Sequence, residues 1–153
     1  SIMSTARWTQ SPFRVTMELM KSDPGTREGR IENGVSAACL LNGSGFEFDE
    51  DYARREITAS LDRAWHPEGT ARQMTAILAD GDRRADLAAV DVPTTVIHGT
   101  DDCLVLPKGG QETADAVPEA ELVWVDGMGH NLPEGAWPVI LDAISGLVKR
   151  AGV

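Results

Sequence analysis

Only two segments of this 153-residue chain have the pattern of a buried β-strand, and this scarcity of strands most constrains its fold. The segments are Thr94–His98 and Leu122–Val125, which are short apolar runs without the alternation of a half-exposed strand. Strands covered on both faces are typical of parallel sheets with helices on each side. A two-stranded sheet of this kind needs neighbours at its edges, so we expect segments from outside this sequence to complete it.

Helical patterns surround the two strands. They predict a short helix at Leu87–Val90, a helix at about Gly109–Val117 between the strands, and a last helix at about Ala136–Arg150. The order strand, helix, strand, helix predicts an α/β fold with a parallel sheet. The last helix has a stripe that we expect to face the core, formed by Val139, Ile140, Ala143, Ile144, Leu147 and Val148.

The part of the chain before about Asp82 is predicted to be entirely helical. The expected helices are Phe13–Met20 after a Ser11-Pro12 start, Arg27–Leu41, a helix capped by Asp49 and ended by Pro67, and about Thr70–Ala79. Their expected inward faces are Ile31, Val35, Ala38 and Cys39, then Ala53, Ile57, Leu61 and Ala64, then Met74, Ile77 and Leu78. We therefore expect a helical unit ahead of the α/β segment.

Composition excludes several classes of partner. The formal net charge of −10, with no basic cluster, argues against nucleic acid, because an acidic surface repels phosphates. The apolar runs are too short to span a membrane, and Ser1–Gln10 lacks the pattern of a signal peptide. Two cysteines, Cys39 and Cys103, form no disulfide framework or metal-ligand pattern. We interpret them as reduced thiols and expect a cytoplasmic protein.

Acidic and basic side chains follow the two strands where each strand ends. Asp101 and Asp102 come after the first strand, and His130 lies in Gly-Met-Gly-His-Asn-Leu-Pro after the second. Functional groups gather at the carboxyl ends of strands in open α/β sheets, so a carboxylate and the imidazole can meet there. The carboxylate would orient the ring, which would act as a base towards a hydroxyl.

These two segments resemble the acid and histidine loops of α/β-hydrolases, in particular aclacinomycin methylesterase-like and proline-iminopeptidase-like esterases. The resemblance implies that Asp102 is the acid and His130 the base, although Asp101 is adjacent and could take the role instead. It also implies a helical lid (cap) over residues 12–85, a C-terminal α/β core segment over residues 86–153, and the end of a core strand with its connection over residues 1–11. Such esterases need no cofactor.

The sequence departs from this family at the nucleophile. The family carries Gly-x-Ser-x-Gly on a strand-to-helix turn, and the 153 residues do not contain this motif. Two partial matches, Gly34–Ala38 and Gly43–Gly45, lie in a helical pattern and at a helix stop. The start at Ser1-Ile2-Met3-Ser4, with no helix cap or initiating methionine, favours a fragment.

We therefore expect the serine to come from a separate N-terminal hydrolase half, or the chain to associate with itself. The expected substrate is a small apolar ester, and the chain alone is expected to be inactive. The alternative is a non-catalytic hydrolase remnant that acts as a binding or oligomerising module.

We expect no catalytic or metal-binding role for the other histidine, cysteine and tryptophan residues. No ligand spacing supports a metal site made of His98, Asp101, Asp102 and His130, so we expect no metal. His98 and His66 are interpreted as structural residues, and Cys103 as an inert thiol. Trp124 and Trp137 are predicted to lie in the core.

Overall fold

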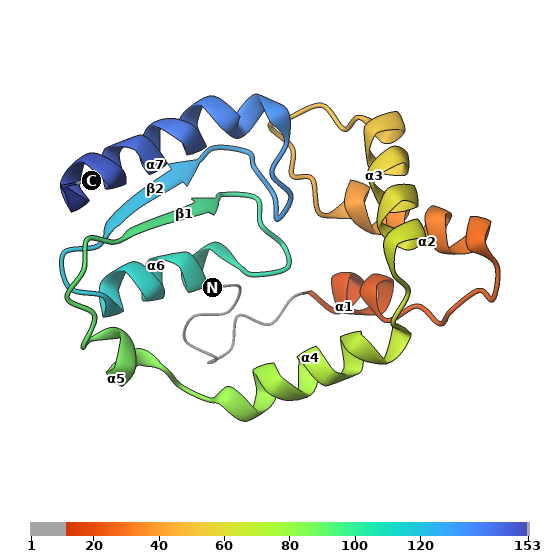
Figure 1. Ribbon diagram of the computed structural model, residues 1–153, viewed down its shortest axis with the longest axis horizontal. Coiled ribbons are helices and arrows are strands. Elements are labelled where there is room, and N and C mark those ends of the chain that lie inside the picture. Colours follow the sequence, from red (N-terminus) through yellow and green to blue (C-terminus); the bar gives the residue numbers. More distant parts are fainter. Residues whose placement is uncertain (1–11, 153) are drawn as a thin grey trace.

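The computed structural model describes residues 12–152, in which a parallel two-stranded sheet lies between helices (Figure 1). Strand β1 spans Thr95–Gly99 and strand β2 spans Glu121–Val125, and the two pair along their whole length. Helix α6 (Pro107–Ala116) connects them, and α7 (Trp137–Ala151) follows β2 after a 3₁₀ turn. The predicted α/β fold with a parallel sheet is confirmed.

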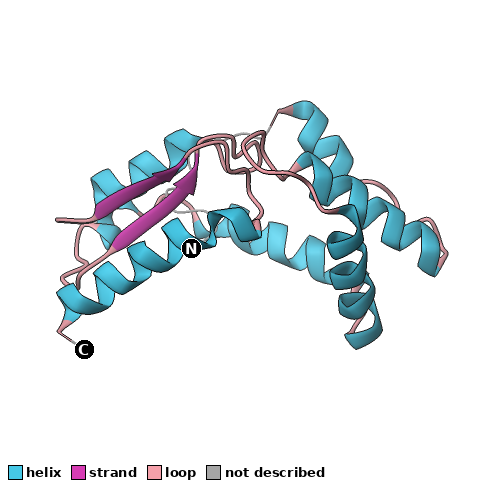
Figure 2. Ribbon diagram, turned by 90° about the horizontal axis from the view of Figure 1, so that it is seen from above, coloured by secondary structure: helices cyan, strands magenta, loops and turns pink. Residues whose placement is uncertain are grey.

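The two faces of the sheet are covered by different helices (Figure 2). Successive side chains of a strand point to opposite faces. Accordingly, Ile97 of β1 and Ile140 of α7 pack against the same buried cluster, whereas a Cβ added to Gly110 of α6 would lie 2.6 Å from the ring of His98. Helices α7 and α6 therefore sandwich the strands, as the unbroken apolar pattern of the strands requires.

The chain before the sheet is helical, as predicted. Its helices are α1 (Phe13–Leu19), α2 (Arg27–Leu40), α3 (Glu50–Arg63), α4 (Pro67–Asp80) and α5 (Arg84–Leu87). Helices α2 and α3 pack as a pair, and α4 extends from them back towards the sheet (Figure 1). We refer to α1–α4 and their connections, residues 12–83, as the helical part.

The packing of α2 on α3 depends on a small residue at one position. Ile31 and Val35 of α2 and Ala53 of α3 are buried, and the two helices are in contact. A Cβ added to Gly34 would lie 2.9 Å from Cγ2 of Ile57, so the glycine allows the two helices to approach closely. The first of the two motifs that partly match a nucleophile turn is thus a helix-packing site.

Two helices of the helical part begin with side-chain caps. The hydroxyl of Thr26 accepts a hydrogen bond from the Gly29 amide at 3.1 Å, and the carboxylate of Asp49 accepts one from the Tyr52 amide at 2.8 Å. Such caps satisfy amides that have no partner inside the helix. The cap predicted at Asp49 is confirmed.

Several predicted helix boundaries were wrong. Pro67 does not end α3, which stops at Arg63, but occupies the first turn of α4. A proline there loses nothing, because the first amides of a helix have no acceptor, and its fixed φ suits the helix. Helix α5 covers Arg84–Leu87 in place of the predicted Leu87–Val90.

The predicted inward faces were partly wrong. Cys39 is exposed, whereas Ile31 and Val35 are buried. Ala64 lies beyond the end of α3 and is exposed. On α7 the exposed members of the predicted stripe are Val139, Ile144 and Val148, whereas Ile140, Ala143 and Leu147 are partly buried.

Trp124 and Trp137, which were predicted to lie in the core, are 39% and 44% exposed. A stripe of apolar residues predicts a packing surface, but residues 12–152 provide contacts for only part of it. The predictions for Ser11 and residues 1–11, and for the side chains of Met74, Ile77 and Leu78, lie outside the described residues and side chains.

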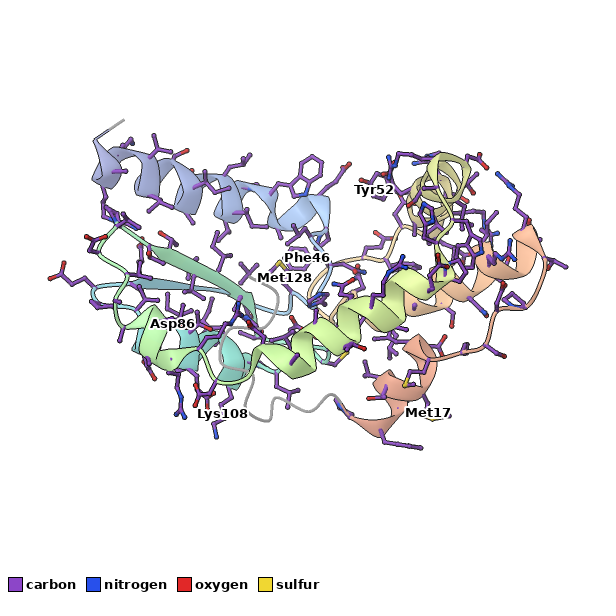
Figure 3. All side chains as sticks on the ribbon, turned by 60° about the horizontal axis from the view of Figure 1, so that its bottom comes forward. Met17, Phe46, Tyr52, Asp86, Lys108 and Met128 are labelled. Carbon is purple, nitrogen blue, oxygen red and sulfur yellow. The ribbon has the colours of Figure 1, made fainter. Side chains whose placement is uncertain are left out.

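A small hydrophobic cluster joins the helical part to the sheet. Val125, Met128 and Ala136 are buried, and Phe46, from the connection between α2 and α3, packs against them together with residues of β1 and α7. Figure 3 shows Phe46 and Met128 side by side below the start of α7. Phe46 thus fixes this connection next to the loop that follows β2.

None of the described helices combines the length and the apolar character that crossing a membrane requires.

Candidate active site

Asp102 lies in the loop after β1, residues 100–106, which we call the acid loop. Its carboxylate is buried, with 6% of the residue exposed. One oxygen, Oδ1, accepts hydrogen bonds from the backbone amides of Leu104 at 2.8 Å and Val105 at 2.9 Å. The two amides belong to the turn that Asp102 itself begins, and their hydrogen bonds hold the carboxylate in one orientation.

His130 lies in the loop after β2, residues 126–133, which we call the histidine loop. Its Nδ1 is 2.9 Å from Oδ2 of Asp102. An ionised carboxylate only accepts hydrogen bonds, so the proton of this bond belongs to Nδ1. In the neutral ring Nε2 is then the basic nitrogen, and the side chain, 29% exposed, keeps access to solvent. The structure therefore brings together the two residues singled out in the sequence.

Burial and hydrogen bonding act in opposite directions on Asp102. Burial raises the pKa of its carboxyl, but the hydrogen bonds from His130, Val105 and Leu104 and the charge attraction to His130 outweigh this effect and lower the pKa below its usual value. The carboxylate is therefore ionised at neutral pH, as the orientation of the imidazole requires.

This lowered pKa predicts a specific loss of stability in acid. The folded-state pKa of Asp102 lies below the unfolded value of 3.8. The stabilisation of the folded state by the ionised carboxylate is therefore complete above that pH and disappears as the pH falls through the folded-state pKa. We expect the free energy of unfolding of the wild type to fall relative to that of Asp102→Asn as the pH is lowered from about 5 through 3.8 and below. Urea unfolding at several pH values measures this, and a constant difference would contradict it.

Asp101, the alternative acid, has a different partner. Its Oδ2 accepts hydrogen bonds from the backbone amide of Ser44, at 3.0 Å, and from the Ser44 hydroxyl. The hydroxyl bond and then the amide bond of Ser44 lower the pKa of Asp101. Its own amide donates to the carbonyl of Met128 at 3.0 Å. Asp101 thus connects three loops, and Asp102 is the carboxylate that reaches the imidazole.

His98 lies on the other side of the acid. Its Nε2 is 2.9 Å from the carbonyl oxygen of Val105, which can only accept, so Nε2 carries a proton. The same nitrogen is 3.7 Å from Oδ2 of Asp102, and the ring packs edge to face on Trp124. These contacts agree with the structural role expected for His98.

Cys103 follows the acid and is half-buried. Its Sγ is 3.6 Å from the carbonyl oxygen of Leu40. Burial and then the charge of Asp102 raise the pKa of the thiol, which keeps it protonated at neutral pH. Among the described residues, no group of three or more histidine, cysteine, aspartate or glutamate side chains could hold a metal ion.

Sequence reasoning missed a third component of the site, the segment Leu41–Phe46 between α2 and α3, which we call the bridging loop. It lies against both loops: the Ser44 amide donates to Asp101 of the acid loop at 3.0 Å, and the Leu41 carbonyl accepts from the amide of His130 in the histidine loop at 2.8 Å. The signal in the sequence was the pair of glycines around Ser44, which we interpreted as a simple helix stop.

The chain has the fold of part of an α/β-hydrolase, in which two parallel strands with flanking helices deliver a buried carboxylate and an imidazole from adjacent loops. In sequence it is similar to two rhodomycin D methylesterases: DauP from Streptomyces sp. (strain C5), 31% identical over 142 residues, and DnrP from Streptomyces peucetius, 30% identical over 142 residues. Each match covers 92% of this chain and 47% of the relative, so the chain spans about half the length of these curated relatives.

The fold is similar to that of solved esterases. The esterase EaEST from Exiguobacterium antarcticum superposes with a TM-score of 0.66 at 18% identity, over 89% of this chain and 47% of that structure. No family model matches the chain.

Proposed function

We propose that Asp102 and His130 are the acid and the base of a Ser-His-Asp triad that hydrolyses a carboxylic ester. The observation that carries this proposal is the 2.9 Å hydrogen bond from His130 Nδ1 to a buried, ionised Asp102. The bond fixes the tautomer in which Nε2 is the basic nitrogen. Within the described residues Nε2 has no hydrogen-bond partner, so it is available to a serine hydroxyl.

The reaction uses the histidine twice. As the serine Oγ attacks the ester carbonyl carbon, Nε2 of His130 takes the serine proton, and Asp102 stabilises the imidazolium that forms. The tetrahedral intermediate expels the alcohol, which receives that proton, and leaves an acyl-enzyme. Water then attacks the acyl carbon, gives its proton to Nε2, and the serine leaves with that proton as the acid is released.

The nucleophile in this proposal comes from a segment outside the 153 residues. No Gly-x-Ser-x-Gly motif occurs among them, and both serines of the partial matches donate their hydroxyl protons to carboxylates. Ser36 donates to Glu18 at 2.7 Å, and Ser44 donates to Asp101. An N-terminal hydrolase half supplies the serine and covers apolar surface that α7 exposes at Trp137, Leu141 and Ile144.

The proposed substrate is a small alkyl ester, such as a methyl ester, on an apolar molecule. Two relatives are rhodomycin D methylesterases by name. In addition, Phe13 and Met17 of α1 and Met20, which follows the helix, are 80%, 54% and 75% exposed. Such an apolar stripe suits contact with an apolar substrate, if the helical part acts as a lid over the active site.

We expect the 153-residue chain by itself to hydrolyse methyl and p-nitrophenyl esters no faster than its His130→Ala variant. The reason is that an imidazole held by a carboxylate still lacks a serine to activate. Initial rates of both proteins, corrected for spontaneous hydrolysis, measure this. Turnover by the wild-type chain that His130→Ala abolishes would place a nucleophile within these residues and contradict the proposal.

A further inference from the structure

The backbone around His130 is attached to the end of helix α2. The carbonyl of Leu41 accepts hydrogen bonds from the amides of His130, at 2.8 Å, and Asn131, at 3.2 Å, and the carbonyl of Asn42 accepts one from Gly129 at 3.0 Å. The side chain of Asn131 donates to the carbonyl of Ala38 at 2.7 Å. The last carbonyls of a helix lack partners within it, and here the histidine loop supplies them.

The bridging loop is also attached to the acid loop, through Ser44. Its amide and its hydroxyl both donate to Oδ2 of Asp101, the residue next to the acid. The amide of Asp101 in turn donates to Met128 of the histidine loop at 3.0 Å. Asp101 is ionised at neutral pH, because these hydrogen bonds lower its pKa, so the attachment is intact there.

The backbones of the bridging loop and the histidine loop are in direct contact. A Cβ added to Gly43 would lie 2.3 Å from the amide nitrogen of Gly129, and one added to Gly129 would lie 2.2 Å from the carbonyl oxygen of Leu41. Backbones in direct contact transmit displacements, because packed interiors contain few voids. Movement of the bridging loop therefore moves His130.

We propose that Ser44 and Asp101 are positioning residues: the hydrogen bonds between them lock the bridging loop across the acid and histidine loops and so hold the imidazole of His130 on Asp102. This inference rests on the proposed function of Asp102 and His130 and names the device that maintains their geometry. Neither Ser44 nor Asp101 touches the reacting atoms in this proposal.

The proton on Nδ1 of His130 reports this device directly, without any assay of activity. In the ¹⁵N-labelled 153-residue chain we expect a downfield Nδ1–H resonance that Asp102→Asn shifts or removes. In Ser44→Ala we expect exchange of this proton with water to be about tenfold faster, the effect of losing roughly one hydrogen bond. Ser44→Thr keeps a hydroxyl, so exchange should remain as slow as in the wild type. Asp101→Asn keeps an acceptor oxygen without the charge, and it should accelerate exchange as Ser44→Ala does.

Ser36→Ala is the matched control. It also removes a serine-to-carboxylate hydrogen bond, from Ser36 to Glu18 at 2.7 Å, but in the helical part away from both loops. The exchange rate of the His130 proton should be unchanged in this variant. Equal rates in Ser44→Ala, Asp101→Asn and Ser36→Ala would overturn the positioning role, with the proposed function intact. Absence of the resonance from the wild type would overturn the proposed function itself.

Discussion

Under the proposed function, replacing His130 with alanine is expected to reduce ester hydrolysis by about 10⁴-fold or more when this chain is combined with an N-terminal hydrolase half that supplies the serine. The variant leaves no base to take the proton of the serine, and it leaves Asp102 buried without the imidazole that it orients. Asp102→Asn is expected to cost about 10⁴-fold, because an amide at that position favours the wrong tautomer of the ring. The measurement is kcat/KM for a methyl ester.

His66→Ala is the control for the loss of a histidine. His66 precedes the first residue of α4, is exposed, and makes no side-chain capping bond, so we expect kcat/KM within about twofold of the wild type. Double replacement of Asp102 and His130 should cost little more than His130→Ala alone, because residues that act as a unit are not additive. Activity of His130→Ala above about one tenth of the wild type would contradict the proposed role.

The sequence was sufficient to predict that Asp101 or Asp102 meets His130, and the resemblance to α/β-hydrolases favoured Asp102. Both residues follow short, unbroken apolar strands, and neighbouring parallel strands end at one edge of a sheet. Topology alone therefore brings the two loops together. It does not decide between Asp101 and Asp102, a choice that depends on which carboxylate the turn directs inward. The buried amides of Leu104 and Val105 make that choice.

The contribution of the bridging loop could not be predicted in the same way. Hydrogen bonds between residues such as Ser44 and Asp101, 57 positions apart, leave no periodic signal in the sequence. The exposed Trp124 and Trp137 have a related explanation. The apolar character of a side chain indicates that it packs against other apolar groups, but the 153-residue sequence does not identify the segment that supplies those groups. Pro67 was misjudged because proline both ends helices and begins them.

Replacing Gly43 with alanine is expected to destabilise the chain by about 3–4 kcal/mol, the largest effect on stability that we expect from adding one methyl group. Gly43 has φ of +85°, which is unfavourable for residues with a Cβ. The new Cβ would also lie 2.3 Å from both the carbonyl oxygen of Gly127 and the amide nitrogen of Gly129. These atoms belong to backbone, so relief requires the bridging loop to move away from the histidine loop.

Gly25→Ala separates the two causes. Gly25 has φ of +76°, yet a Cβ there would meet nothing within 4 Å, so this variant has the backbone strain without the clash. We expect it to cost about 1 kcal/mol, as measured by urea unfolding alongside Gly43→Ala. The difference between the two variants is the cost of the clash between the new Cβ and the backbone of the histidine loop. Equal costs for the two variants would contradict the close backbone contact of Gly43 with the histidine loop.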